Sequence, residues 1–262
     1  MTPLIINAIS NVVAPSSRQL GLVFRTWGGA RAGAGRKPRG DRPGVSHLRR
    51  PAHSRHHPLH ITLRVQRAVG SLREHSLFGV VRQALAAAKQ QFGFSLVHFS
   101  VQRDHLHLIA EAHDRRALAR GVQGLSIRVA RAVNRRLQRT GRLFADRYHA
   151  RALKTPREVR FALRYVLLNV RKHARSSQQP STQSRATGES VPAGFVDSCS
   201  SAAWFQGFGR PRELAFGAHA VRSEWLRRSG CTDPPVSEAS SWLLRAGQRR
   251  VGGFDLDDTP GA

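Results

Sequence analysis

The stretch DHLHLI at residues 104–109 alternates polar and apolar side chains, which is the pattern of a half-buried β-strand. Side chains two positions apart on a strand point the same way. His105 and His107 therefore share one face of the strand, and Leu106 and Leu108 share the other. If the leucines meet the helices that cover the sheet, the two imidazoles lie on its open face.

The chain on either side of this strand continues the alternation. Apolar residues alternate over 97–101, and a short turn at 102–104 separates them from the DHLHLI strand. Residues 94–112 are therefore expected to form a β-hairpin. The same alternation over 59–65 predicts an earlier strand, and residues 147–154 are expected to add a later one.

Three stretches have the spacing of amphipathic helices. Apolar residues recur at helical intervals over 77–92, and Gly93 is placed to end that helix. A second apolar stripe runs over 118–132, with arginines coating much of the remaining surface. The third helix begins at TPRE, residues 155–158, which supplies a capping hydroxyl, a proline at the first helical position and a capping-box glutamate.

The order of these elements predicts the fold class. A β-α-β-β-α-β order followed by a further helix is typical of an α+β fold, a ferredoxin-like or RRM-like antiparallel sheet with helices on one face. Residues 178–262 open with a Ser/Gln/Thr-rich linker and then hold scattered apolar anchors. We expect this segment to be a partly disordered extension draped over the domain.

The charge of the chain indicates a polyanionic partner. The formal net charge is +27, and residues 178–262 hold nine basic and nine acidic residues, so the whole excess lies in residues 1–177. Clustered arginines favour nucleic acid because binding releases counterions from the phosphate backbone. Candidate backbone contacts lie on the second helix, with a merely solvated basic face as the alternative, and include Arg128, Arg131 and Arg135.

Residues 1–56 are expected to form a flexible basic arm rich in Gly, Pro, Arg and Ser. Its glycines do not form a dinucleotide-binding loop, because no third glycine follows and no strand precedes them. The arm is either laid into a DNA groove through residues such as Arg36 and Lys37, or it is a solvated linker.

Cysteine use and hydropathy bear on the compartment. Both cysteines, Cys199 and Cys231, lie in the tail without metal-ligand spacing, which favours a reducing cytoplasm over a disulfide scaffold. No apolar run reaches the roughly 20 residues of a membrane span, and the N-terminus lacks the features of a signal peptide. We therefore expect no membrane partner.

Tyr165 and Asn169 are four positions apart and hence neighbours on one helix face. Taken singly, Tyr165 is more often a packing aromatic, Asn169 a surface amide, and a His-x-His pair an ordinary surface or core feature. Taken together, two imidazoles can chelate a divalent cation, an amide oxygen can complete its ligands, and a phenol can attack an electrophile.

The His-hydrophobe-His strand resembles the HUH motif, and the Tyr-x-x-x-Asn helix resembles the nucleophile helix of single-tyrosine HUH transposases. The resemblance extends over roughly residues 57–175 and is closest to the REP-associated tyrosine transposases. It implies an HUH endonuclease fold for residues 57–177, with a nucleophile helix and extended termini. It also implies that His105, His107 and Asn169 hold Mg²⁺ or Mn²⁺ and that Tyr165 is the nucleophile.

The implied activity is cleavage and rejoining of DNA through a 5′-phosphotyrosine, with single-stranded or hairpin DNA as partner. The resemblance further implies a bacterial, nucleoid-associated cytoplasmic protein that acts as a monomer or homodimer. Removal of the proton from Tyr165 could be assisted by the metal, by Arg164 or by His60. The sequence does not choose between these three.

This chain departs from many family members at two positions. Val170 stands where proline often follows the asparagine, which lets the helix continue toward Lys172, and Asp104 stands where asparagine often precedes the first histidine. Two alternative functions remain open. One is a non-catalytic RRM-like nucleic-acid binder derived from such a transposase. The other, weaker, is a plasmid relaxase, which usually has larger domains and three-histidine sites.

Overall fold

The computed structural model describes residues 50–170, 192–208, 211–230 and 233–258. At its centre is an antiparallel sheet with the strand order β2-β3-β4-β1-β5. Without the short edge strand β2, this is the strand order of a ferredoxin-like sheet, so the expected α+β class is confirmed. The strands are β1 (Leu59–Arg64), β2 (Gln90–Gln91), β3 (Phe94–Val101), β4 (His105–Ala112) and β5 (His149–Ala152).

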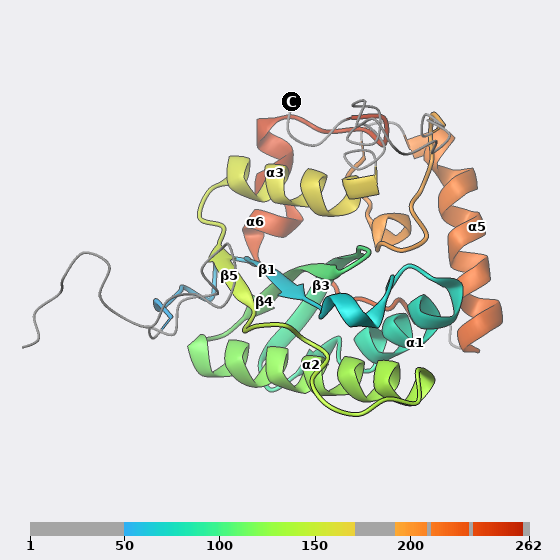
Figure 1. Cartoon of the computed structure of the whole chain (residues 1–262). Coiled ribbons are helices and arrows are strands. Elements are labelled where there is room, and N and C mark those ends of the chain that lie inside the picture. The colour runs from blue at the N-terminus through green and yellow to red at the C-terminus, as the bar shows by residue number, and fades with distance from the viewer. Residues whose placement is uncertain (1–49, 171–191, 209–210, 231–232, 259–262) are drawn as a thin grey trace, which may run out of the picture. The chain divides into compact units, whose positions relative to one another are not determined.

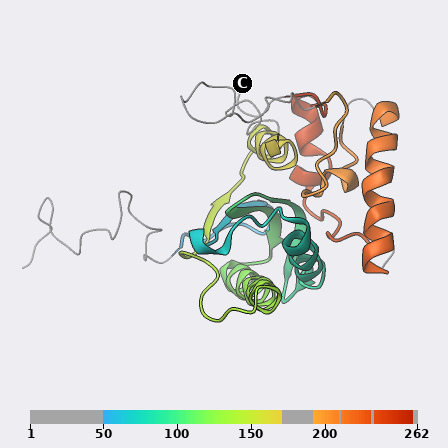
Figure 2. The same ribbon diagram turned by 45° about the vertical axis from the view of Figure 1, so that its right-hand side comes forward.

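Two helices, α1 (His75–Ala86) and α2 (Arg115–Arg136), cover one face of the sheet, and α3 (Pro156–Leu167) lies over the other (Figures 1 and 2). The leucines of the DHLHLI stretch face α1 and α2, where Leu106 and Leu108 are completely buried. The apolar stripe of α2 also lies in this core, as its spacing predicts.

The helix expected over 77–92 is shorter than its apolar spacing indicates. It ends at Ala86, and the chain then forms β2, which pairs with the start of β3. Phe92 and Gly93 make the turn between these strands with positive φ angles of 52° and 72°. Gly93 therefore supports a hairpin turn and not a helix end. Phe92 is 68% exposed, so its place in the apolar pattern was coincidental.

The second face of the sheet is not open, contrary to the expectation for the histidine side. A second apolar core forms there between α3, residues of β3 and β4, and the C-terminal segment from residue 196 onward. Residues 199–201 also extend the sheet along the edge of β3: Val101 N–H donates to Cys199 O at 2.8 Å, and Ser201 N–H donates to Phe99 O at 2.9 Å. The C-terminal segment thus covers a strand edge that would otherwise present unpaired backbone groups.

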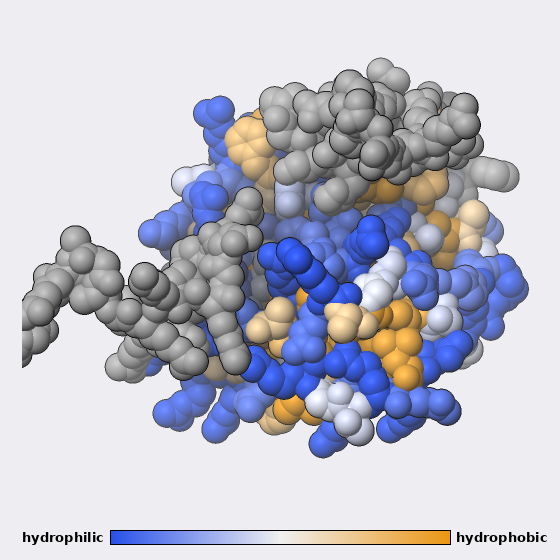
Figure 3. All heavy atoms as spheres, viewed as in Figure 1, coloured by the Kyte–Doolittle hydropathy of each residue, from blue (hydrophilic) through white to orange (hydrophobic). Residues whose placement is uncertain are grey.

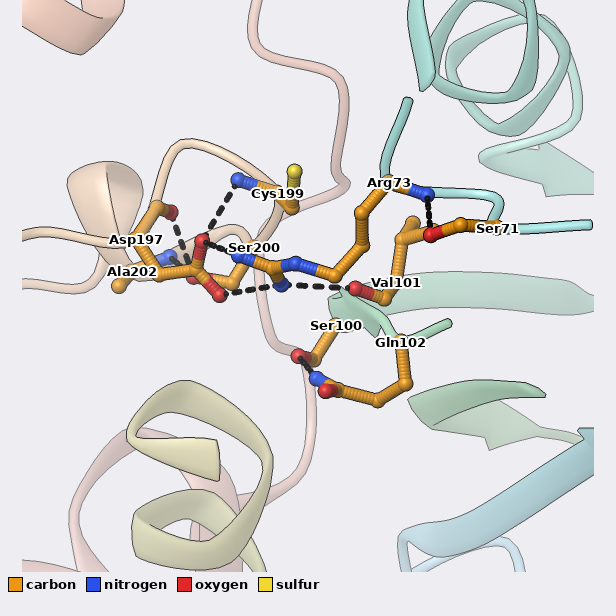
Figure 4. Close-up of polar contacts among 9 residues, drawn as sticks. All are labelled: Ser71, Arg73, Ser100, Val101, Gln102, Asp197, Cys199, Ser200 and Ala202. Carbon is orange, nitrogen blue, oxygen red and sulfur yellow. Dashed lines mark hydrogen bonds and ion pairs between the residues drawn. The ribbon is translucent and has the colours of Figure 1, made fainter. Parts of the chain in front are cut away.

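A buried ion pair fastens this segment to the sheet (Figure 4). Arg73 donates from both terminal nitrogens to the Asp197 carboxylate, at 2.9 and 2.7 Å, and one of them also donates to Val101 O at 3.0 Å. Asp197 is 2% exposed and also accepts from Cys199 N–H. A two-point Arg–carboxylate contact fixes orientation as well as distance, so the segment has a defined place on the domain.

The remaining C-terminal elements add to the same core. They include α5 (Pro211–Ser229) and α6 (Trp242–Arg245), and the backbone N–H groups of Ser240 and Ser241, just before α6, donate to the buried Glu111 carboxylate. Of the apolar anchors that the sequence singles out, Trp225, Leu243 and Leu244 are buried, Trp204 and Phe205 are half-buried, and Trp242 is 52% exposed.

Most of the described surface in the view of Figure 3 is hydrophilic. Within the described residues, no helix combines the length and the apolar character needed to cross a lipid bilayer.

Candidate active site

The two histidines of β4 lie side by side on the α3 face of the sheet. Their ring centroids are 4.6 Å apart. On the neighbouring strand β1, Thr62 lies opposite His107 and Arg64 lies opposite His105. The alternation of the sequence therefore predicts correctly which side chains share a face with the imidazoles.

Asp104 orients the first histidine. His105 Nδ1 lies 2.7 Å from the Asp104 carboxylate, which assigns the proton to Nδ1 and leaves the lone pair on Nε2. Partial burial tends to raise the pKa of Asp104, but the hydrogen bond and charge of His105 and the charge of Arg64 outweigh it, so this pKa lies below its usual value. A carboxylate behind an imidazole in this way is a common support for a metal ligand.

His107 occupies the centre of the cluster and is 5% exposed. Its Nδ1 lies 3.2 Å from His60 Nε2 and 3.3 Å from Thr62 Oγ1, both on β1. Its Nε2 lies 3.4 Å from the Tyr165 hydroxyl oxygen. The ring therefore directs Nδ1 toward β1 and Nε2 toward α3.

Tyr165 is brought to the histidines by α3. The helix begins with the expected capping box: Glu158 N–H donates to Thr155 Oγ1, and the Glu158 carboxylate accepts from Thr155 N–H. Its apolar side, including Val159, Leu163 and Val166, is buried against the sheet.

The Tyr165 ring meets the His107 ring nearly edge-on, at a centroid distance of 4.9 Å. Burial raises the pKa of the Tyr165 phenol above its usual value, so the hydroxyl stays protonated unless a neighbouring group assists.

Asn169 lies just beyond α3. The helix does not continue unbroken toward Lys172: it ends at Leu167, and Leu168, with φ −110° and ψ 17°, interrupts it before residues 169 and 170 are helical again. Lys172 lies outside the described residues. Asn169 is 1% exposed, and neither its amide oxygen nor its amide nitrogen has a hydrogen-bond partner among the described residues.

The paired imidazoles are ligands of a type that suits a divalent cation. The hydrogen bond to Asp104 leaves a lone pair on His105 Nε2, and the buried Asn169 amide oxygen lacks the partner that a buried acceptor normally has. Within the described part of the chain, no group of three His, Cys, Asp or Glu side chains is arranged for a metal.

Basic residues of the edge strand β5 border the cluster and were not singled out from the sequence. His149 lies opposite Thr62, and Arg151 lies opposite His60. Burial, with the charges of His149 and Arg151, lowers the pKa of His60 to about 4. The alternation over 147–154 could have revealed this placement if the strand had been paired with 59–65. Arg164, a candidate for assisting Tyr165, instead lies 3.8 Å from Asp258.

The candidate DNA-contacting residues do not gather at this site. Arg128, Arg131 and Arg135 lie on α2, which covers the opposite face of the sheet. Arg36 and Lys37 lie outside the described residues. Tyr148, the second tyrosine of the chain, packs against the core on the α1–α2 side under the Arg50 guanidinium, 3.7 Å from its ring centroid.

A mixed sheet-and-helix domain that sets a tyrosine beside a pair of strand histidines is the architecture expected of a DNA-transposing protein. Comparison with protein families agrees: residues 54–167 match the family described as "Transposase IS200 like". The resemblance of this part of the chain to transposases is therefore confirmed.

Two solved structures are similar to this chain over part of its length. One is a REP-associated tyrosine transposase bound to a REP hairpin, with 17% identity, a TM-score of 0.41, and coverage of 49% of this chain and 74% of that one. The other is a candidate transposase from Deinococcus radiodurans, with 18% identity, a TM-score of 0.32, and coverage of 37% and 78%. A search of curated proteins found no match.

Proposed function

We propose that this protein is a divalent-metal-dependent single-strand DNA endonuclease and strand transferase of the REP-associated tyrosine transposase type. The observation that carries the proposal is the approach of the Tyr165 hydroxyl to within 3.4 Å of His107 Nε2, next to the second imidazole of His105. The two imidazoles come from β4, the phenol of Tyr165 comes from α3, and the amide of Asn169 comes from the residues just after α3.

His105, His107 and Asn169 would hold the cation. A bound Mg²⁺ or Mn²⁺ would supply charge neutralisation and alignment for the scissile phosphate. The chain's own residues supply the rest. Asp104 holds the His105 ring, the β1 residues His60 and Thr62 hold the His107 ring, and the capped helix α3 holds the phenol in place.

The reaction is a transesterification at phosphorus. The Tyr165 oxygen forms a bond to the phosphorus, the 3′ oxygen of the preceding nucleotide leaves and takes up a proton, and the 5′ end of the cut strand remains as a phosphotyrosine. A free 3′-OH reverses these steps and rejoins the strand, so no external energy source is needed. The phenol loses its proton locally, and the nearest imidazoles are those of His107 and His60.

The arginines of α2 lie on the other face of the sheet and cannot touch the phosphate at Tyr165. We propose that Arg128, Arg131 and Arg135 contact DNA backbone outside the cut site. A non-catalytic RRM-like binder is the less favoured alternative, because the central strands present histidines where such modules present stacking aromatics.

The direct test is covalent attachment of the full-length protein to a hairpin oligonucleotide with single-stranded flanks, labelled at its 3′ end and taken from the DNA that surrounds the gene. In Mn²⁺ or Mg²⁺ we expect a labelled protein band that survives denaturation, and we expect EDTA to abolish it. Tyr165→Phe should give no labelled band, because the substitution removes only the nucleophilic oxygen.

Tyr148→Phe is the matched control, since Tyr148 is the chain's other tyrosine. It should attach DNA at the wild-type level. Attachment by Tyr165→Phe would contradict the proposal. Oligonucleotide binding without cleavage in either metal would instead favour the RRM-like alternative.

A further inference from the structure

A cavity of about 630 Å³ lies outside the histidine cluster, on the α3 side of the sheet. Its walls come from Val97 and His98 of β3, from residues 204–207 and from the segment 234–249. None of the residues assigned above to cleavage lines it. Several of its apolar wall residues belong to the core that also supports α3, so the cavity is built into the fold.

Two buried polar side chains, Gln248 and His98, line the cavity. Gln248 is 1% exposed, and its amide oxygen has no hydrogen-bond partner in the described part of the chain. An unsatisfied buried acceptor costs on the order of 1–3 kcal/mol, which a ligand donor would recover. His98 Nδ1 lies within hydrogen-bond distance of Ser201 Oγ, at 3.2 Å. Nε2 is the second polar atom of this cavity-lining residue.

Positive charge surrounds the same space. Arg222, Arg245 and Arg249 are among the residues that line the cavity, and none of the three forms an ion pair with a described residue. The one carboxylate that lines it, Glu238, is exposed. Three cations against one carboxylate favour an anionic ligand, and arginine suits phosphate in particular.

Aromatic side chains form part of the wall. Trp204 and Phe205 are half-buried there, and the Phe205 ring meets the His98 ring edge-on at 5.4 Å between centroids. Aromatic rings beside arginines are the surface on which an unpaired nucleobase stacks. The volume lies within the range of small-ligand sites.

We propose that this cavity binds a nucleotide, with the base against Trp204 and Phe205 and within reach of Gln248 and His98, and the phosphate at the arginines. The nucleotide chemistry follows from the cavity itself. Its source, an unpaired nucleotide of the DNA strand on which Tyr165 acts, rests on the proposed function. The C-terminal segment would then read one base of the substrate in addition to covering the sheet.

The first experiment is calorimetric titration of the full-length wild-type protein with dAMP, with inorganic phosphate and with a single-stranded tetranucleotide. We expect saturable dAMP binding, at least tenfold weaker binding of phosphate alone, and displacement of dAMP by the tetranucleotide. No dAMP binding, or equal binding of phosphate and dAMP, would overturn the nucleotide site. Binding of dAMP that the tetranucleotide cannot displace would overturn the strand as its source.

Two variants test the residues. Gln248→Leu, which cannot accept a hydrogen bond, should weaken dAMP binding about tenfold and leave phosphate binding unchanged. The double variant Arg245→Ala/Arg249→Ala should weaken both ligands by tenfold or more. The matched control, Arg116→Ala/Arg120→Ala on α2, removes the same charge away from the cavity and should bind dAMP like the wild type.

Thermal unfolding of each variant separates a lost contact from a lost fold. Because Arg245 and Arg249 are exposed, their double variant should melt like the wild type even if Gln248→Leu does not. Unchanged dAMP affinity in a folded double variant would contradict the proposal. Tyr165→Phe should retain full dAMP binding, so a failure of cleavage and a failure of this site give different results.

Discussion

The two faces of strand β4 show how neighbouring residues come to serve opposite purposes. On one face, Leu106 and Leu108 are completely buried under α1 and α2. On the other, His105 and His107 meet a phenol, a carboxylate and a second strand's polar side chains.

The first face is stabilised by the removal of apolar area from water. The second buries polar groups whose hydrogen bonds only offset the loss of hydration. In the proposed mechanism, the leucine face serves the fold and the histidine part of the other face serves the chemistry. Substitutions on the two faces should separate stability from activity.

The largest effect should come from His105→Ala on the polar face. A metal ligand contributes several kcal/mol of transition-state stabilisation, which corresponds to a loss of about 10³-fold in the cleavage rate. The free energy of unfolding should change by less than about 1 kcal/mol, because the side chain lies at the surface end of the cluster and is not part of an apolar core. Single-turnover cleavage in Mn²⁺ and urea unfolding measure the two quantities.

Leu106→Ala, one residue further on, should have the reverse profile. Truncation of a fully buried leucine costs about 2–5 kcal/mol in the free energy of unfolding. The fraction that remains folded should cleave DNA at close to the wild-type rate. If Leu106→Ala lost activity as severely as His105→Ala while staying folded, the separation between the two faces would not hold.

A third prediction concerns pH and the covered part of the polar face. Burial lowers the pKa of His98 to about 4, against about 6.5 in an unfolded chain, so the unfolded state binds more protons at pH values between these two. Stability should therefore be full above pH 6.5 and should fall by roughly 2 kcal/mol between pH 6.5 and 5.

His60, whose pKa is also lowered to about 4, adds to this loss in the same direction. The variant His98→Gln should lose less stability over the same pH range, as urea unfolding at both pH values would show. An equal loss in the variant would mean that His98 does not contribute.

The smallest effect should come from Asp104→Asn. The carboxylate touches His105 at 2.7 Å and would act on a bound cation only through that ring. Removal of such a supporting carboxylate typically weakens metal affinity or activity 10- to 100-fold. Cleavage measured over a Mn²⁺ titration should show a higher half-saturating concentration with a largely retained maximal rate. No change at any Mn²⁺ concentration would show that Asp104 does not position the ligand.

Much of the domain could be predicted from the sequence because the patterns that indicate its strands and helices involve residues close together in the chain. The alternation of 59–65 and 94–112 and the capping box at Thr155 each depend on residues within a few positions of one another, and each is present in the structure. The pairing of His105 with His107 follows from strand geometry alone. The prediction that Tyr165 lies beside these histidines depended on the resemblance to the transposases.

The packing of the C-terminal segment over the second face of the sheet could not be predicted, since it depends on contacts between residues far apart in the sequence. Arg73 and Asp197 are 124 positions apart, and no periodic pattern links them. The anchors of the C-terminal segment are scattered, so their spacing gives no element. Likewise Phe92 fits a helical period by chance, and the β2–β3 turn prevails because residues 92 and 93 adopt positive φ.

The most direct test of the central claim is mass spectrometry of the trapped protein–DNA adduct. Trypsin should release the peptide of residues 165–171, because Arg164 precedes it. After nuclease digestion we expect a nucleotide 5′-phosphate on this peptide, attached to Tyr165. A nucleotide on the Tyr148 peptide, or an adduct on any other residue, would contradict the account.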